Sequence, residues 1–327
     1  MDSPGAPTPS GAPTPEVITM GRVGVDLYPE QIGATLAEVR TFAKSLGGSA
    51  TNVAVAAARL GRRAAVITKV GKDGFGDYVR RALVEFGVDT RWVATDPTLR
   101  TPIVFCEIHP PDRFPLLFYR EPKAPDMNLA KDELDLPAIA DAPLFWTTGT
   151  GLADEPSRTA TLAALDARKG REFTVHDLDY RPMFWRSAED ARRLSREAVR
   201  RATVVVGNTD EVEMAAATRD PRAGAAALLE LGAKIAIVKR GGEGVYARTA
   251  LEEVTVPAVK IPVLNGLGAG DAFGGALCHG LLAGWPLRRT LEAANAAGAI
   301  VASRLACADA MPTLAEIDGV LARKVSA

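Results

Sequence analysis

Runs of apolar, β-forming residues alternate with segments of helical periodicity along almost the whole chain. The apolar runs predict strands at Val17–Leu27, Ala64–Val70, Leu144–Thr148, Glu172–Asp177, Thr203–Gly207 and Lys234–Lys239. Apolar residues that recur every three or four positions predict helices at Thr51–Leu60, Phe75–Phe86, Ala188–Arg201, Ala223–Leu231, Asp271–Ala283, Thr290–Arg304 and Thr313–Arg323. Because strands that alternate with helices are typical of α/β proteins, we expect a mostly parallel central sheet with helices on both faces.

One region interrupts this alternation and predicts a small β lid. Two β-type runs, Thr101–Ile108 and Pro115–Arg120, are joined by a turn that contains two prolines. The edges of such a hairpin need cover, so we expect it to project as a lid or to pair with another subunit as a homodimer. The lid is predicted to comprise about residues 29–44 and 100–121 of a single domain spanning 16–327. Residues 1–15, rich in Pro, Ser, Gly, Thr and Ala, are predicted to form a disordered tail.

The composition narrows the function classes. The 327 residues carry a formal net charge of −1, which gives no electrostatic reason to expect a nucleic-acid or membrane partner. The longest uncharged run, residues 272–287, is too short to span a bilayer. Three widely spaced cysteines indicate reduced, buried thiols, and three scattered histidines argue against a His-rich metal site. We therefore expect a soluble, cytoplasmic protein.

The most informative motif lies late in the chain, at Gly268-Ala269-Gly270-Asp271. Three small residues at the start of a helix leave backbone N–H groups uncovered, and a helix N-terminus attracts anions, so this turn suits a phosphate. A carboxylate beside a phosphate is repelled. Asp271 is better explained as a base that accepts a proton from a hydroxyl attacking phosphorus. The alternative is a glycine-rich turn in which Asp271 caps the helix.

Two segments in the N-terminal part are candidates for contact with a small polar ligand. Asp26 stands at the end of the first predicted strand, where open parallel sheets bind ligands, and the alternative is an ordinary turn aspartate. Gly47-Gly48 opens a helix and lets backbone approach a ligand closely, while Asn52 offers a donor and an acceptor. Paired glycines before a helix are also found in simple turns.

Two segments in the C-terminal half are candidates for nucleotide and metal binding. Asn208 and Glu211 follow a strand, and their oxygen atoms suit Mg²⁺, directly or through water. The same spacing also predicts a helix cap with Asn208 as the N-cap residue. The turn from Lys239 to Gly244, which includes Gly241, is a candidate to pass over a nucleotide or, equally, an ordinary hairpin turn.

Arginines are candidates to bind a substrate carboxylate. Arg181 follows a strand in Asp177-Leu178-Asp179-Tyr180-Arg181-Pro182, and Arg120 lies on the predicted lid. A guanidinium forks onto a carboxylate, and the alternative for each arginine is an ion pair with a nearby Asp or Glu. Most candidate residues lie at or just past predicted strand ends and should therefore converge on one edge of the sheet. These residues are Asp26, Asn52, Asp177, Asn208, Lys239 and Asp271. Their convergence favours an enzyme.

These motifs resemble those of the ribokinase-like (PfkB) sugar kinase family. The resemblance covers essentially everything after the tail, with Gly47-Gly48, Asn52, Asn208-x-x-Glu211 and Gly268–Asp271 in the family's order. It implies a three-layer α/β sandwich with a small β lid and ATP-dependent phosphorylation of a sugar hydroxyl. The implied roles are catalytic base for Asp271; anion hole for Gly268, Ala269 and Gly270; sugar binding for Asp26, Gly47, Gly48 and Asn52; Mg²⁺–phosphate binding for Asn208 and Glu211; and ATP contact for Lys239, Gly241, Gly244 and Asn295.

Within that family, four stretches resemble kinases of keto-deoxy sugar acids in inositol catabolism, namely residues 21–29, 114–126, 178–185 and 307–312. This implies an acid acceptor that is phosphorylated on its terminal hydroxyl, and it gives Arg120 and Arg181 a carboxylate to bind. Residues 179–185 also resemble 2-keto-3-deoxygluconate kinases. Many family members carry an Asp that helps to bind a monovalent cation where this chain has Asn265, so the resemblance leaves activation by K⁺ open.

Other classes of protein fit the sequence less well. A nicotinamide-dependent dehydrogenase expects G-x-G-x-x-G after an early strand, where this chain runs into Asp26. A P-loop NTPase expects G-x-x-x-x-G-K-[ST], which is absent. A sugar or nucleotide sensor without catalysis is a further alternative on the same fold, and the intact Asp271 argues against it.

Overall fold

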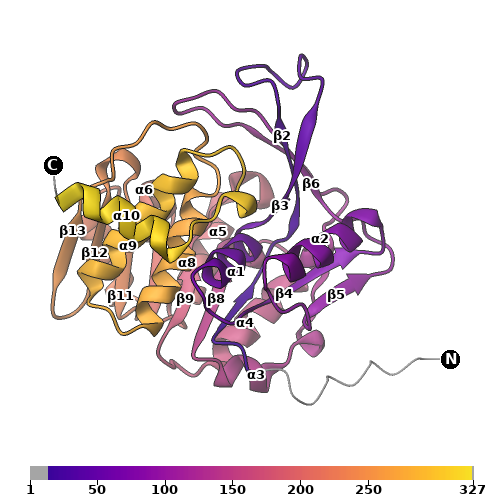
Figure 1. Cartoon of the computed structure of the whole chain (residues 1–327). Coiled ribbons are helices and arrows are strands. Elements are labelled where there is room, and N and C mark those ends of the chain that lie inside the picture. Colours follow the sequence, from indigo (N-terminus) through magenta and orange to yellow (C-terminus); the bar gives the residue numbers. More distant parts are fainter. Residues whose placement is uncertain (1–13, 326–327) are drawn as a thin grey trace.

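The computed structural model describes residues 14–325, which form a large and a small β-sheet with helices around the large one (Figure 1). The strands of the large sheet are β1 (Val17–Met20), β4 (Ala64–Gly71), β5 (Val93–Asp96), β8 (Leu144–Thr148), β9 (Thr174–Asp177), β10 (Val204–Asn208), β11 (Ile235–Lys239), β12 (Val245–Arg248) and β13 (Glu253–Val256). Their spatial order is β13-β12-β11-β10-β9-β8-β1-β4-β5. All neighbours are parallel except β11–β12 and β12–β13. The predicted mostly parallel sheet is confirmed.

Helices cover both faces of this sheet, as predicted. One face carries α1 (Ser49–Arg59), α2 (Gly74–Glu85), α8 (Ala269–Leu282), α9 (Leu287–Ala302) and α10 (Leu314–Val325). The other carries α3 (Leu136–Asp141), α4 (Ser157–Ala167), α5 (Ala188–Val199), α6 (Thr209–Ala216) and α7 (Pro221–Glu230). Because helices cover both faces, central strands such as β4 and β8 are buried at every position rather than at alternate ones. The result is a three-layer α/β sandwich.

The small sheet projects from one edge of the sandwich (Figure 1). It consists of β2 (Gly24–Pro29), β3 (Phe42–Gly47), β6 (Ile103–Cys106) and β7 (Leu116–Tyr119), in the order β3-β2-β6-β7. The hairpin predicted around residues 101–120 is confirmed, since β6 and β7 pair antiparallel. In the other predicted lid segment, 29–44, β3 begins only at Phe42 and continues past the predicted end to Gly47.

The single strand predicted at Val17–Leu27 is wrong, because the chain leaves the large sheet after Met20. Gly21 has φ of 152°, and a Cβ there would stand 2.7 Å from the Thr148 side-chain oxygen on β8. The backbone therefore turns at a position that only glycine fills, and the remaining apolar residues form β2 of the small sheet. Asp26 lies on β2, not at the end of a strand of the large sheet as expected.

The pattern of apolar residues does not predict every helix and strand. Helices α3, α4 and α6 and strands β5, β12 and β13 are absent from the prediction. In α4 the apolar residues are mostly alanines, so the two faces of the helix differ little in hydrophobicity. Of the tail predicted over 1–15, residues 1–13 lie outside the described part. None of the helices in residues 14–325 has the length and apolar character needed to cross a bilayer.

Candidate active site

The close packing of α8 on α1 fixes the position of the late glycine-rich motif. Gly268, with φ of 79°, is the N-cap residue of α8, and no side chain caps the helix. A Cβ on Gly275 would stand 2.2 Å from the Ala56 Cβ of α1, so glycine lets the two helices approach closely. The first turns of α1 and α8 therefore face each other.

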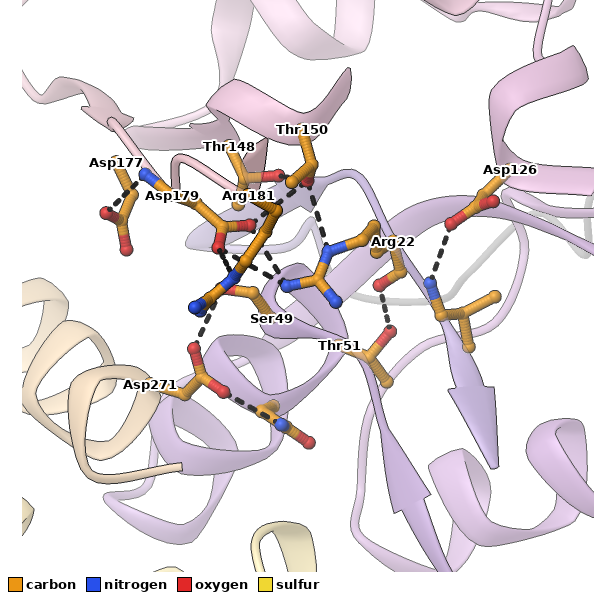
Figure 2. A network of polar contacts seen from close by, with 12 residues as sticks. Arg22, Ser49, Thr51, Asp126, Thr148, Thr150, Asp177, Asp179, Arg181 and Asp271 are labelled. Carbon is orange, nitrogen blue, oxygen red and sulfur yellow. Dashed lines mark hydrogen bonds and ion pairs between the residues drawn. The ribbon is translucent and has the colours of Figure 1, made fainter. Parts of the chain in front are cut away.

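Asp271 bridges these two helix starts (Figure 2). Ser49 Oγ donates to Asp271 Oδ1 at 2.7 Å, and Asn52 Nδ2 donates to Oδ2 at 2.8 Å. Desolvation raises the pKa of Asp271, although both hydrogen bonds oppose the shift. Among the described residues Asp271 has no ion-pair partner, and it does not cap α8 as the alternative expected. A carboxylate with a raised pKa and no direct ion pair is suited to accept a proton.

Two cavities meet at Asp271. The larger, about 720 Å³, and the smaller, about 70 Å³, share the lining residues Ser49, Arg181, Leu267, Gly268 and Asp271. The larger cavity is also lined by the predicted phosphate, nucleotide and metal residues Ala269, Gly270, Asn208, Glu211, Lys239, Gly241, Gly244 and Asn295. The smaller is also lined by the predicted sugar residues Asp26, Gly48 and Asn52. The predicted convergence at one site is therefore present, although roles are not shown by position alone.

Gly47 lines neither cavity and acts as a spacer beside one. A Cβ at Gly47 would stand 2.1 Å from Asp26 Oδ1, so the missing side chain makes room for that carboxylate. Burial raises the pKa of Asp26 to about 6, although the hydroxyl of Tyr28, 3.2 Å from Oδ2, lowers it. The Tyr28 hydroxyl also lies 2.7 Å from Cys307 Sγ. The buried Asn52 Oδ1 has no hydrogen-bond partner among the described residues and faces a site where a ligand hydroxyl would supply one.

Positive potential gathers where the larger cavity approaches Asp271. Within residues 14–325 the backbone N–H groups of Ala269 and Gly270 make no hydrogen bond, and both residues line the cavity. Lys239 Nζ lies 3.4 Å from the position that a Cβ on Gly270 would take, and 3.8 Å from Asp177 Oδ1. Burial lowers the pKa of Lys239, but the carboxylates of Asp177 and its neighbours outweigh this and leave the pKa raised. A helix N-terminus with an ammonium beside it is suited to bind a phosphoryl group.

The segment proposed for Mg²⁺ forms the helix cap that was its alternative. Asn208 Oδ1 accepts from Glu211 N at 2.9 Å, and Glu211 Oε2 accepts from Asn208 N at 2.7 Å. Both residues nevertheless line the larger cavity, with the buried Asp177, whose pKa is raised to about 7 by burial. No group of three or more metal-ligating side chains is arranged around one point in the described residues. These oxygen donors suit Mg²⁺ only if phosphate and water supply the remaining ligands.

The two candidate arginines differ in their surroundings. Arg181 Nε donates to Asp179 Oδ1 at 3.1 Å, while its side chain stays 40% exposed and lines both cavities. Arg120 Nη2 donates to Asp126 Oδ1 at 2.6 Å, is buried, and lines neither cavity. The ion-pair alternative therefore describes both arginines. Only Arg181 also faces the site, so the assignment of Arg120 to the substrate is not supported by its position.

Several residues of the site were missed from the sequence. They are Arg22, Tyr28, Ser49 and Cys307, which line the smaller cavity, and Asp179, which lines the larger. Ser49 directly follows the paired glycines, so its place at the start of a helix was a usable indication. Arg22 has no such local indication, because its partners come from distant parts of the chain.

A buried carboxylate beside a helix N-terminus with free N–H groups, at the junction of two cavities on an α/β sandwich, is the arrangement expected of a small-molecule kinase. The comparisons with known proteins agree. The family model described as "pfkB family carbohydrate kinase" matches residues 14–314, and the chain belongs to this family.

Relatives and solved structures give the same result over nearly the whole length. The chain is 35% identical over 310 residues to a 5-dehydro-2-deoxygluconokinase from Geobacillus kaustophilus, covering 93% of this chain and 92% of the relative. A candidate Ribokinase II from E. coli in complex with ATP and Mg²⁺ superposes with a TM-score of 0.86 at 25% identity, covering 94% and 99% of the two chains. A double-mutant fructokinase from Vibrio cholerae with fructose, ADP and potassium ion gives 0.81 at 25% identity, covering 95% and 99%.

Asn265 bears on the potassium ion seen in that fructokinase. Asn265 is fully buried; its Nδ2 donates to the carbonyl of Leu305, and its Oδ1 accepts from Leu267 N at 3.0 Å. Both ends of the amide are therefore used within the protein, and the side chain carries no charge to offset a cation. These residues do not fit a monovalent cation bound at Asn265.

Proposed function

We propose that this kinase transfers the γ-phosphoryl group of ATP to the terminal hydroxyl of a keto-deoxy sugar acid. The proposed acceptor is 5-dehydro-2-deoxy-D-gluconate, converted to its 6-phosphate in myo-inositol catabolism, as the name of the Geobacillus relative supports. The observation that carries the proposal is the position of Asp271, between a cavity with free helix N–H groups and a cavity with Asp26 and Asn52. The use of ATP and the buried free thiols of three cysteines support a cytoplasmic location.

In this proposal the acceptor lies in the smaller cavity and its terminal hydroxyl points at Asp271. Asp271 takes the hydroxyl proton as the oxygen attacks the phosphorus. The N–H groups of Gly268, Ala269 and Gly270 and the ammonium of Lys239 stabilise the negative charge on the transferring group. The small sheet closes over the acceptor and excludes water that would otherwise hydrolyse ATP.

Glu211 and Asn208 are the proposed contacts for Mg²⁺ on the nucleotide phosphates, through water. When bound, the ion would neutralise phosphate charge and orient the phosphoryl group. The carboxylate of Glu211 is buried and lines the cavity, and its Oε2 already accepts from Asn208 N. A water-mediated contact between Glu211 Oε1 and Mg²⁺ is consistent with this geometry, whereas direct coordination of the ion by Asn208 and Glu211 together is not.

A coupled ADP-release assay tests the proposal. Purified protein with ATP and Mg²⁺ is offered 5-dehydro-2-deoxygluconate, 2-keto-3-deoxygluconate, fructose and ribose. We expect the highest kcat/KM for the first acid. A preference for 2-keto-3-deoxygluconate, or for a neutral sugar, would move the assignment to the alternative activities in the same family. If none of the four acceptors causes ADP release, a sensor without catalysis would be the better explanation.

We also propose that two copies associate through the outer face of the small sheet. Phe118 on β7 lines the smaller cavity, so its neighbours Leu117 and Tyr119 point to the opposite face, where they are 47% and 61% exposed. Phe105 contacts Tyr119 at 5.4 Å and Phe42 at 5.3 Å between ring centroids on that face. Exposed aromatic surface of this kind is typical of interfaces. Light scattering on the protein and on Tyr119→Glu tests this: a monomer in both would refute it.

A further inference from the structure

Arg22 is buried beside the smaller cavity with part of its hydrogen-bonding capacity unused. It lies in the turn between β1 and β2 and is 8% exposed. Its Nε donates to Thr150 Oγ1 at 3.1 Å, and its Nη2 donates to Asp179 Oδ2 at 3.1 Å. Its Nη1 has no hydrogen-bond partner among residues 14–325, and the side chain lines the cavity. A guanidinium fixed at two nitrogens and open at the third is ready to bind an acceptor atom of a ligand.

Arg22 shares its only ion-pair partner among the described residues. Arg22 and Arg181 both bind Asp179, so two guanidinium groups share one carboxylate (Figure 2). Burial raises the pKa of Asp179, but the two arginines outweigh it and lower the pKa, so the carboxylate is ionised. Asp26 and Asp271 line the same cavity and lie near Arg22 without forming an ion pair with it. A carboxylate on a ligand would therefore be a second direct partner for the two guanidinium groups.

The backbone around Asp179 keeps the two arginines in place. Asp179 has φ of 29°, in the left-handed region that non-glycine residues rarely adopt. Its side chain is held by Arg22, Arg181 and the Thr150 hydroxyl, which donates to Oδ2 at 3.0 Å. The Arg22 guanidinium, held through Nε and Nη2, is thus positioned before any ligand enters, which reduces the entropy lost on binding.

We propose that Arg22, through Nη1, binds the carboxylate of the acceptor together with Arg181, and that Arg22 selects acids over neutral sugars. This rests on the proposed function, since it names the residue that recognises the acid in that same cavity. A carboxylate supplies a second anionic partner for the two arginines and an acceptor oxygen for each. A neutral sugar supplies only uncharged acceptors, and it leaves Arg22 and Arg181 sharing Asp179.

The test compares acid and uncharged acceptors of equal length. The variant Arg22→Met is assayed with 5-dehydro-2-deoxygluconate and with its primary amide. We expect kcat/KM for the acid to fall about 10- to 100-fold, mainly through KM, because a charge-assisted hydrogen bond is lost. The value for the amide should change less than about 3-fold. Arg120→Lys is the matched control: it also alters a buried arginine stacked on Phe184, and we expect it to leave the acid-to-amide ratio unchanged.

Equal losses for acid and amide would show that Arg22 only maintains the pocket, and would overturn the proposal. If Arg22→Met does not fold, Arg22→Gln keeps a donor for Thr150 or Asp179 without the charge, and an unchanged acid-to-amide ratio in that variant would overturn it too. Failure of the proposed function is seen separately, because the unmodified protein would then phosphorylate no sugar acid.

Discussion

Replacing Asp26 by Asn should stabilise the ligand-free protein while weakening acceptor binding. Burial raises the pKa of Asp26 from 3.8 to about 6. In the unfolded chain this carboxyl group has its ordinary pKa, so between the two values the folded protein binds a proton that the unfolded chain has released. Stability is therefore lost as the pH rises from about 4 to above 6. A shift of about 2 units amounts to about 3 kcal/mol at pH 8 and roughly half of that at pH 5.

Urea denaturation of Asp26→Asn and of the unmodified protein at pH 5 and pH 8 measures this difference. The asparagine keeps an oxygen that can accept from Tyr28, so loss of the charge is the main change. Asp112→Asn, in the exposed turn between β6 and β7, is the control and should stay within about 0.5 kcal/mol at both pH values. A variant that is less stable than the unmodified protein at pH 8, or a gain of equal size at both pH values, would refute the reasoning.

Asp26 should also make kcat/KM fall on the acid side of the pH profile. If ionised Asp26 accepts a hydrogen bond from the substrate hydroxyl, kcat/KM for the acceptor should fall as the pH drops through about 6. The raised pKa of Asp271 acts in the same direction, since protonated Asp271 cannot accept a proton. In Asp26→Asn the limb that belongs to Asp26 should disappear together with most of the acceptor affinity.

Three further outcomes are expected. Asp271→Asn should lower kcat by about 10²–10⁴-fold and leave ATP affinity intact by calorimetry; near-normal turnover would remove Asp271 as the base. Because the Asn265 amide is uncharged and forms hydrogen bonds within the protein at both its oxygen and its nitrogen, turnover should be the same in potassium and in tetramethylammonium buffers, and a several-fold potassium stimulation would contradict this. Gly275→Ala should lower the free energy of unfolding by about 1–3 kcal/mol, measured by thermal or urea denaturation, and reduce kcat, because the new Cβ would stand 2.2 Å from the Ala56 Cβ. An unchanged unfolding midpoint would show that α8 can move away from α1 at little cost.

The parts of the candidate site whose positions could be predicted are those set by local sequence. Gly268 to Asp271 form one helix turn, so their spacing alone brings a helix N-terminus beside a carboxylate. The helix cap formed by Asn208 and Glu211 was one of the two interpretations of residues 208–211, the other being a Mg²⁺ site. The gathering of strand ends was also predictable, because Asn208 pairs in register with Lys239 in a parallel sheet.

The parts that were missed depend on contacts between distant residues. Arg22 and Asp179 are 157 positions apart, and nothing near either indicates the other. Arg120 had two possible partners, a substrate or a nearby acid, and only the folded chain shows that Asp126 is in reach. The end of β1 is set by Thr148 on a neighbouring strand, which leaves no space for a side chain at position 21. An apolar run read alone cannot reveal such a constraint.

The distribution of charge around Asp271 bears on the proposed mechanism. The larger cavity offers Lys239 and a helix N-terminus beside Asp177 and Glu211, and the smaller offers Arg22 beside Asp26, so each cavity carries cationic groups that can bind an anionic group directly. In the proposed mechanism the phosphoryl group and the acceptor meet at Asp271, whose negative charge repels the phosphoryl group. That repulsion would end once the hydroxyl proton passes to Asp271. We therefore expect transfer to the bound acceptor to be favoured over attack by water when the small sheet closes behind it.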